Sequence, residues 1–227
     1  MKNIHQFKLA LYALIRFVYV LIAMGISLFL PAGTISFSGG IHAICILLIP
    51  TLILGIVLFF RNPIMLKKRL ETKETRKEQK IITAVMTAII GSGLIVSGID
   101  YRFTLTSIPK FLKFTGVATT IFSYILYGLV FSKNKFLHKT ICVENKQYVI
   151  DDGIYGLIRH PMYLATIMMY FSIAIATDSL LTVLIFLLLL PIVYFRINDE
   201  ENFLKSALPG YVDYIKKVKY RLVPYIW

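Results

Sequence analysis

The sequence predicts an all-α integral membrane protein with about six transmembrane helices. Of its 227 residues, 57% are hydrophobic and only 16% are charged, whereas a soluble domain is usually near half apolar and a quarter charged. The mean hydropathy is +0.73. Several apolar stretches also reach the roughly 20 residues that a helix needs to cross a bilayer. These observations argue against a soluble enzyme.

The first four spans are expected at residues 9–30, 41–60, 81–99 and 111–131. The first should be retained as a span, because its apolar run exceeds the ~7–15 residues of a signal-peptide core and no small-residue cleavage site follows it. Pro50 is expected to interrupt the second helix, because proline has no N–H to donate. In the third, Ala88/Ser92 and Gly93/Ser97 are small-residue pairs that let a neighbouring helix approach closely.

The last apolar stretch, residues 162–197, is too long for one span. Its polar break at Thr177-Asp178-Ser179 predicts two short helices joined as a tight hairpin. Pro191 is expected to interrupt the second of them. Beyond the hairpin, apolar and aromatic residues recur at helical spacing between lysines over 211–222. This pattern predicts a cytoplasmic, amphipathic carboxyl-terminal helix on the membrane surface, either as an interfacial anchor or as a lid over a substrate.

The formal net charge of +13 is unevenly placed along the chain. Of the 25 Lys and Arg residues, 22 lie in the amino-terminal stretch, the second and fourth loops and the tail. The positive-inside rule therefore predicts that both termini and both long loops are cytoplasmic. The basic residues lack the pattern of a nucleic-acid-binding module, so we expect membrane lipid phosphates as their counter-ions and no nucleic acid partner.

Two polar clusters flank the predicted hairpin, at residues 151–163 and 196–201. Each residue has an ordinary explanation as a turn, a helix start or an interfacial anchor, and Asp199 is expected on a solvated helix end. Arg196 and Glu200 are four residues apart, so they share a helix face and can pair. Because the two ends of a hairpin lie side by side, the clusters should meet. Among the basic residues, Arg159 and Arg196 are expected to have a role beyond fixing the orientation of the protein in the membrane.

Other chemical signatures are weak. The sequence has no phosphate loop, no glycine-rich dinucleotide turn and no HExxH motif. Its four histidines are scattered, and its two cysteines, Cys45 and Cys142, make neither a disulfide framework nor a cysteine-rich metal site. We therefore expect no bound metal.

The ordered set of polar motifs resembles the isoprenylcysteine carboxyl methyltransferase family, membrane enzymes that use S-adenosylmethionine and are more distantly related to phospholipid N-methyltransferases. The resemblance is strong from Phe136 to Trp227 and weaker back to Arg61, where residues 62–70 look like the bacterial branch. It implies the plasma membrane of a bacterium. The matching motifs are Gly-Ile-Tyr (153–155), Arg-His-Pro-Met-Tyr (159–163), Arg-Ile-Asn-Asp-Glu-Glu (196–201), Pro-Gly-Tyr (209–211) and Arg-Leu-Val-Pro (221–224).

The resemblance also implies roles for individual residues. Arg196 should hold the substrate carboxylate and act as the catalytic residue. A strand before Gly153 should contact the cofactor partly through its backbone, although many relatives have His where this chain has Gln147. The residues implied to bind S-adenosylmethionine are Gln147, Tyr148, Val149, Ile150, Tyr155, His160, Pro161, Met162, Tyr163 and Glu200.

The expected organisation is an amino-terminal pair of spans with a basic loop, residues 1–80, followed by a methyltransferase core, residues 81–227. The leading functional expectation is methyl-ester formation on a prenylated cysteine or similar lipophilic carboxylate. One alternative is N-methylation of a phospholipid or other amine, which requires deprotonation of an ammonium group. A different class is a non-catalytic lipid-binding membrane protein, which would not bind S-adenosylmethionine.

Overall fold

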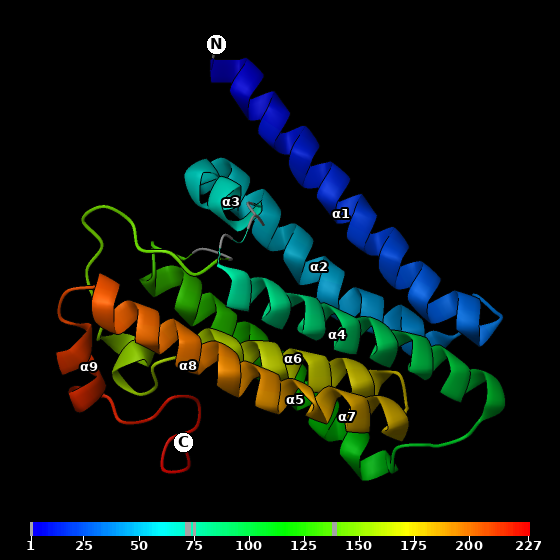
Figure 1. Cartoon of the computed structure of the whole chain (residues 1–227). Helices are drawn as coiled ribbons and strands as arrows, with labels where there is room; N and C mark the ends of the chain where they lie inside the picture. Colours follow the sequence, from blue (N-terminus) through cyan, green and yellow to red (C-terminus); the bar gives the residue numbers. More distant parts are fainter. Residues whose placement is uncertain (1, 71–73, 75, 138–139) are drawn as a thin grey trace.

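The computed structural model describes residues 2–70, 74, 76–137 and 140–227, and confirms an all-helical membrane architecture. Helix accounts for 76% of the described residues, and these contain no strand. The α-helices, labelled in Figure 1, are α1 (Lys2–Ala32), α2 (Ser38–Arg61), α3 (Pro63–Leu70), α4 (Lys77–Phe103), α5 (Lys110–Lys133), α6 (Pro161–Ala176), α7 (Leu180–Leu187), α8 (Leu189–Ala207) and α9 (Tyr211–Lys217). A 3₁₀ turn, η1 (Gly153–Gly156), lies between α5 and α6.

The predicted spans are confirmed as apolar helices of membrane-crossing length. Among the residues that the structure describes, five stretches qualify by length and composition, and α6 is a shorter apolar helix of 16 residues. The five are Gln6–Ala32, Ser38–Arg61, Lys77–Phe103, Lys110–Lys133 and Leu180–Ala207.

The two prolines behave differently from each other. The helix between α7 and α8 breaks at Leu188, one turn before Pro191, because a proline cannot donate to the carbonyl four residues earlier. The expected interruption at Pro50 is wrong, since α2 continues through it. The carbonyl of Ile46, which the N–H of residue 50 would have bonded, accepts the hydroxyl of Tyr124 on α5 instead. A neighbouring helix thus satisfies the carbonyl that the proline leaves without its helical partner.

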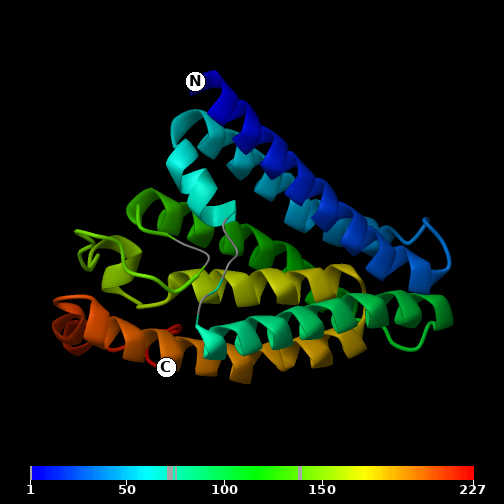
Figure 2. The same ribbon diagram turned by 45° about the horizontal axis from the view of Figure 1, so that its top comes forward.

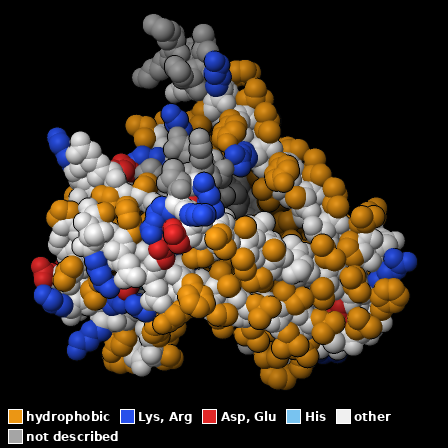
Figure 3. Space-filling model, in the orientation of Figure 1, with side chains coloured by type: hydrophobic (Ala, Val, Ile, Leu, Met, Phe, Trp, Pro, Cys, Tyr) orange, Lys and Arg blue, Asp and Glu red, His pale blue; other side chains and the backbone are white. Residues whose placement is uncertain are grey.

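The helices form a bundle whose polar segments gather at one end. In Figures 1 and 2 the amino terminus, α3, α9 and the carboxyl-terminal tail lie toward the same end of the bundle, opposite the α4–α5 and α6–α7 connections. Lys and Arg side chains cluster over that end in Figure 3, while the face along the helices is largely hydrophobic. This arrangement agrees with the one-sided charge distribution in the sequence. That this end is cytoplasmic stays a prediction.

Helix α4 makes close approaches through its glycines. An added Cβ at Gly93 would lie 2.3 Å from the Phe186 ring of α7, and one at Gly98 would lie 2.4 Å from the Leu28 carbonyl of α1. Gly93 and Ser97 are buried, so this predicted small-residue pair does face neighbours. The other pair, Ala88 and Ser92, is exposed.

A buried carboxylate fixes the hairpin at the far end from the polar segments. The predicted turn at 177–179 is confirmed, and Ser179 accepts the Thr182 N–H as the cap of α7. Asp100, at the end of α4, accepts bonds from Ser179 Oγ at 2.5 Å and from the Thr106 N–H at 2.7 Å. One acidic group therefore joins α4, the following loop and the hairpin turn.

The carboxyl-terminal helix is shorter than expected and packs on the protein. Helix α9 ends at Lys217, and Tyr211 and Tyr214 are each only 5% exposed. They pack with Leu208 and Val218 in one cluster. The apolar side chains are thus buried inside the protein, and they are not available to a membrane surface as the amphipathic pattern suggested.

We predict that Gly98→Ala destabilises the bundle by about 1–3 kcal/mol, because the new methyl group meets a backbone oxygen that can move only with α1. Gly91→Ala on the same helix is the control, since an added Cβ there meets nothing within 4 Å. It should be neutral or slightly stabilising, given the better helix propensity of alanine. Thermal unfolding in detergent compares the two. Equal midpoints would contradict the close α1–α4 packing.

Candidate active site

A cavity of about 460 Å³ opens among the polar segments beside α6 and α8. All eleven residues to which the sequence assigned a site role line this one cavity, although they come from four separate stretches of the chain. They are Gln147, Tyr148, Val149, Ile150, Tyr155, His160, Pro161, Met162, Tyr163, Arg196 and Glu200. The expected meeting of the two hairpin ends is therefore observed.

The start of α6 brings the first cluster into place. His160 precedes the helix and Pro161 occupies its first turn, a position that suits the fixed φ of proline. The backbone of this stretch is held by the tail, because the N–H groups of Arg159 and His160 donate to the carbonyls of Tyr220 and Arg221, both at 2.9 Å. The two residues that precede α6 are thus hydrogen-bonded to a segment about 60 residues later in the chain.

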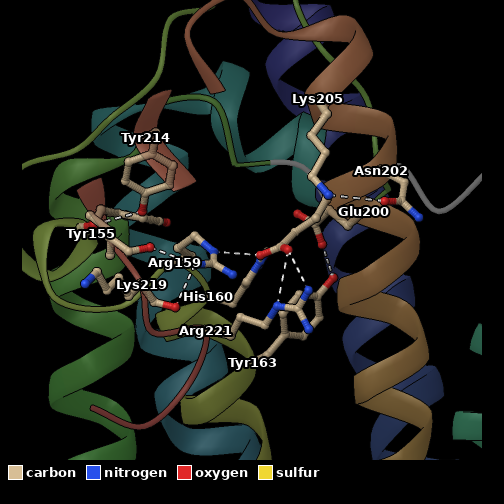
Figure 4. Close-up of polar contacts among 12 residues, drawn as sticks. Tyr155, Arg159, His160, Tyr163, Glu200, Asn202, Lys205, Tyr214, Lys219 and Arg221 are labelled. Atoms are coloured by element: carbon tan, nitrogen blue, oxygen red, sulfur yellow. Dashed lines mark hydrogen bonds and ion pairs between the residues drawn. The ribbon is translucent and has the colours of Figure 1, made fainter. Parts of the chain in front are cut away.

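A buried carboxylate on α8, that of Glu201, holds these segments together; Figure 4 labels its partners Arg159, His160 and Arg221. Glu201, whose side chain is 2% exposed, accepts Arg159 Nε at 2.7 Å and faces His160 Nε2 at 3.1 Å on one oxygen. Its other oxygen accepts Arg221 Nη2 at 3.0 Å. Arg159 also donates to the carbonyls of Val218 and Lys219 at 2.7 and 2.9 Å. Arg159 therefore does more than set topology, as expected, and its contacts secure the tail.

Arg196 and Glu200 are linked through a third residue. The Tyr163 hydroxyl accepts Arg196 Nε at 2.9 Å and donates to Glu200 Oε2 at 2.5 Å, so it bridges the two charges. Arg196 Nη1 also donates to Thr83 on α4 at 3.1 Å. The i,i+4 relation predicted that Arg196 and Glu200 share a face. The tyrosine bridge from the opposite arm of the hairpin could not be read from that spacing.

On the opposite side of the cavity, Tyr155 lies on η1. Its hydroxyl accepts Asn134 Nδ2 at 3.0 Å, and its carbonyl accepts the Tyr214 hydroxyl at 2.8 Å. Burial raises the pKa of Tyr155 to about 12. The phenol is therefore neutral at physiological pH and can serve the site only as a hydrogen-bonding and apolar wall.

The segment expected to be a cofactor strand, residues 147–150, lines the cavity but is neither helix nor strand. The Gln147 side chain turns back and accepts the Glu144 N–H at 2.8 Å, so it stabilises its own loop. Tyr148 is 55% exposed and lies edge-on to Phe136. The strand expectation fails because no neighbouring strand is present among the described residues to complete a ladder.

Several site features were missed by sequence reasoning. Asp199 is not on a solvated end, because it accepts Arg76 Nη2 at 2.7 Å and also bonds the Gln79 amide at the start of α4. Glu201 was recognised only as part of a charged run. To predict its role from the sequence, one would have to know that the carboxyl-terminal tail folds back and places Arg221 beside it. The cavity also includes residues of α3, α4, α6 and α9 that received no role, namely Arg69, Thr83, Thr166, Tyr170, Tyr211 and Tyr214.

Comparison with known families identifies the class of protein. Residues 111–209 match the family model described as phospholipid methyltransferase, and this range contains all eleven predicted site residues. This segment therefore matches the family of membrane methyltransferases related to the isoprenylcysteine carboxyl methyltransferases, which confirms the resemblance found in the sequence. A search of curated proteins finds no match to the chain. Family and apolar helices together indicate a membrane methyltransferase.

We predict that Glu201→Gln destabilises the protein by about 3–5 kcal/mol, because the substitution leaves the buried Arg159 without its carboxylate. At about 2–4 °C per kcal/mol, thermal unfolding should detect the change easily. Trypsin should also cleave the released tail near Lys219 and Arg221 faster than in the unsubstituted protein.

The matched control is Asp213→Asn, which removes an ion pair to Lys216 at 3.1 Å whose side chains are 80% and 73% exposed. Such exposed pairs contribute about 0–1 kcal/mol. If both variants showed the same unfolding midpoint and the same tail cleavage, the Glu201 network would not hold the tail in place.

Proposed function

We propose that the protein transfers a methyl group from S-adenosylmethionine to the carboxylate of a prenylated cysteine or a similar lipophilic acid, giving a methyl ester. The observation that carries this proposal is the hydrogen-bonded group Arg196–Tyr163–Glu200 on the wall of the cavity. The guanidinium of Arg196, whose geometry suits a carboxylate, is half-buried there, and so is the carboxylate of Glu200. The family supports the methyltransferase class, and the acceptor is our inference.

The chemistry of the cavity fits S-adenosylmethionine. Its volume lies within the roughly 300–1,000 Å³ of small-molecule sites. Glu200 supplies a carboxylate for hydroxyl or ammonium groups, and six tyrosines provide ring faces that attract a sulfonium cation. We assign cofactor contacts to the ten residues that the resemblance implied, with Gln147 acting through its backbone because its side chain bonds Glu144.

Arg196 has the central role in the proposed reaction. S-adenosylmethionine, when bound, supplies an electrophilic methyl group. A carboxylate is already ionised and nucleophilic at neutral pH, so the chain needs to position it and exclude water and needs no strong base. Arg196 binds the carboxylate, while Tyr163 fixes the guanidinium against rotation. The acceptor oxygen forms the new C–O bond as the C–S bond breaks, and no proton is transferred.

A second candidate is N-methylation of a lipid amine, which the description of the matching family favours. In that case Glu200, which lines the cavity and accepts the Tyr163 hydroxyl, is the group that we assign to receive the proton. An amine acceptor must lose a proton before attack, so its rate should rise with pH around neutrality and above. A carboxylate acceptor should give a rate that is flat over the same range.

The product distinguishes the candidates. Purified protein in nanodiscs would receive methyl-labelled S-adenosylmethionine and a panel of lipophilic acids and amines. Ester formation is expected, and mild base should release the label as methanol. Base-stable label on an amine would establish N-methylation instead. Absence of S-adenosylmethionine binding would support the non-catalytic lipid-binding alternative.

We predict that Arg196→Ala lowers kcat/KM for a carboxylate acceptor by about 10- to 100-fold, the effect expected when a charged hydrogen bond of about 1.5–3 kcal/mol is lost. Affinity for S-adenosylmethionine should change much less. Thr83→Val is the control, because it removes only the neutral bond to the guanidinium. Unchanged ester formation by Arg196→Ala would show that Arg196 does not hold the acceptor.

A further inference from the structure

A second and larger cavity, of about 810 Å³, lies between the amino-terminal helices and α5. Most of its lining comes from residues 10–70, which precede the segment that matches the methyltransferase family. Helices α1 and α2 diverge from the rest of the bundle toward α3, as Figures 1 and 2 show. The amino-terminal pair thus builds a hollow that the family match alone does not explain.

The lining of this cavity suits a hydrocarbon chain. It is mainly aliphatic and aromatic, including Phe17, Leu54 and Phe131. Among the described lining residues, the only charged side chains are Arg16 and Arg69, which are both cations. An apolar cavity whose charged members are both positive is complementary to a lipid chain that ends in an anionic group.

The dimensions also fit a chain of lipid length. The wall formed by α2 extends from residue 47 to residue 60. At 1.5 Å per residue this is about 20 Å of helix. One lipid chain spans about half of the roughly 30 Å hydrocarbon core of a bilayer, which is a shorter distance. The hollow is therefore deep enough for most of one lipid chain.

Arg69 connects the two cavities, because it lines both of them. Its Nη1 lies 3.9 Å from the Met162 sulfur, and its guanidinium lies 5.3 Å from the centre of the Phe131 ring. Next to it, the Tyr127 hydroxyl, on the side of the larger cavity, bonds Thr166 Oγ1 on the side of the candidate active site at 2.7 Å. A thin wall of side chains on α3, α5 and α6 thus separates the hollow from the cavity that holds Arg196.

We propose that this second cavity binds the hydrocarbon chain of the methyl acceptor and that Arg69 guides its anionic head group into the candidate active site. The proposal rests on the proposed function and extends it, because it gives the amino-terminal helices a role in acceptor binding. The acceptor enters from the bilayer through the hollow between α1, α2 and α5, while the candidate active site opens among the polar segments.

Two glycines provide positions from which a larger side chain can enter the second cavity. Gly55 on α2 and Gly128 on α5 line the cavity, and an added Cβ at either meets nothing within 4 Å. Gly55→Phe and Gly128→Phe should therefore fill the hollow. Gly91→Phe on α4 is the control, because Gly91 has the same open surroundings and lines neither cavity.

The first measurement is binding, which does not require methyl transfer. A diazirine-bearing palmitic acid is photo-crosslinked to the protein in nanodiscs, with unlabelled palmitic acid as competitor. We expect competable label on peptides from residues 10–20 and 47–60, reduced about tenfold in Gly55→Phe and Gly128→Phe, because excluding two methylene groups already suffices for that factor. Label that is not competable, or equal in these variants and Gly91→Phe, would overturn the proposal.

The second measurement is the chain-length dependence of methyl transfer, with N-acetyl-S-farnesylcysteine and N-acetyl-S-hexylcysteine as acceptors. Filling the hollow should lower kcat/KM about tenfold for the farnesyl acceptor and leave the hexyl acceptor nearly unchanged. Equal losses for both acceptors would overturn the proposal. Competable crosslinking without methylation of either acid would retain the lipid site and reject the proposed function, so the two failures are distinguishable.

Discussion

The carboxylate of Glu201 is the interaction on which the candidate site depends. It lies almost completely buried on α8 and joins Arg159, His160 and Arg221, which lie on two other segments of the chain. Buried charges are costly unless they are paired and hydrogen-bonded. Here the pairing holds the entrance to α6, the polar end of α8 and the tail in one arrangement. Tyr163 on α6 and Arg196 on α8 can then form their hydrogen bond on the wall of the cavity.

A second acidic residue, Asp100, has a similar structural role at the opposite end of the bundle, where it joins α4 to the turn of the hairpin. The α6–α8 hairpin is thus fixed at both ends by carboxylates, while its middle packs through apolar contacts such as Phe186 against Gly93. This division suits a membrane methyltransferase, in which polar chemistry is confined to one end. The amino-terminal pair lies outside the family match and adds an apolar hollow beside that end.

The sequence predicted the spans, the hairpin turn at 177–179 and eleven of the residues that line the cavity, because hydropathy and ordered polar motifs are local signals. It failed where a distant group decides the outcome. Pro50 does not break α2, since Tyr124 from another helix satisfies the carbonyl of Ile46. Lysines between apolar positions indicated a surface helix, yet Tyr211 and its neighbours are buried against the protein. The bridge made by Tyr163 likewise depends on tertiary contacts that spacing does not encode.

The central claim is that the cavity between residues 147–163 and α8 is the S-adenosylmethionine pocket. The most direct test is ultraviolet crosslinking of methyl-tritiated S-adenosylmethionine to the purified protein, with S-adenosylhomocysteine as competitor and peptide mapping of the label. We predict competable label on peptides spanning residues 147–163 or 196–214. Label that resists competition, or that maps to residues 10–60 around the second cavity, would contradict it.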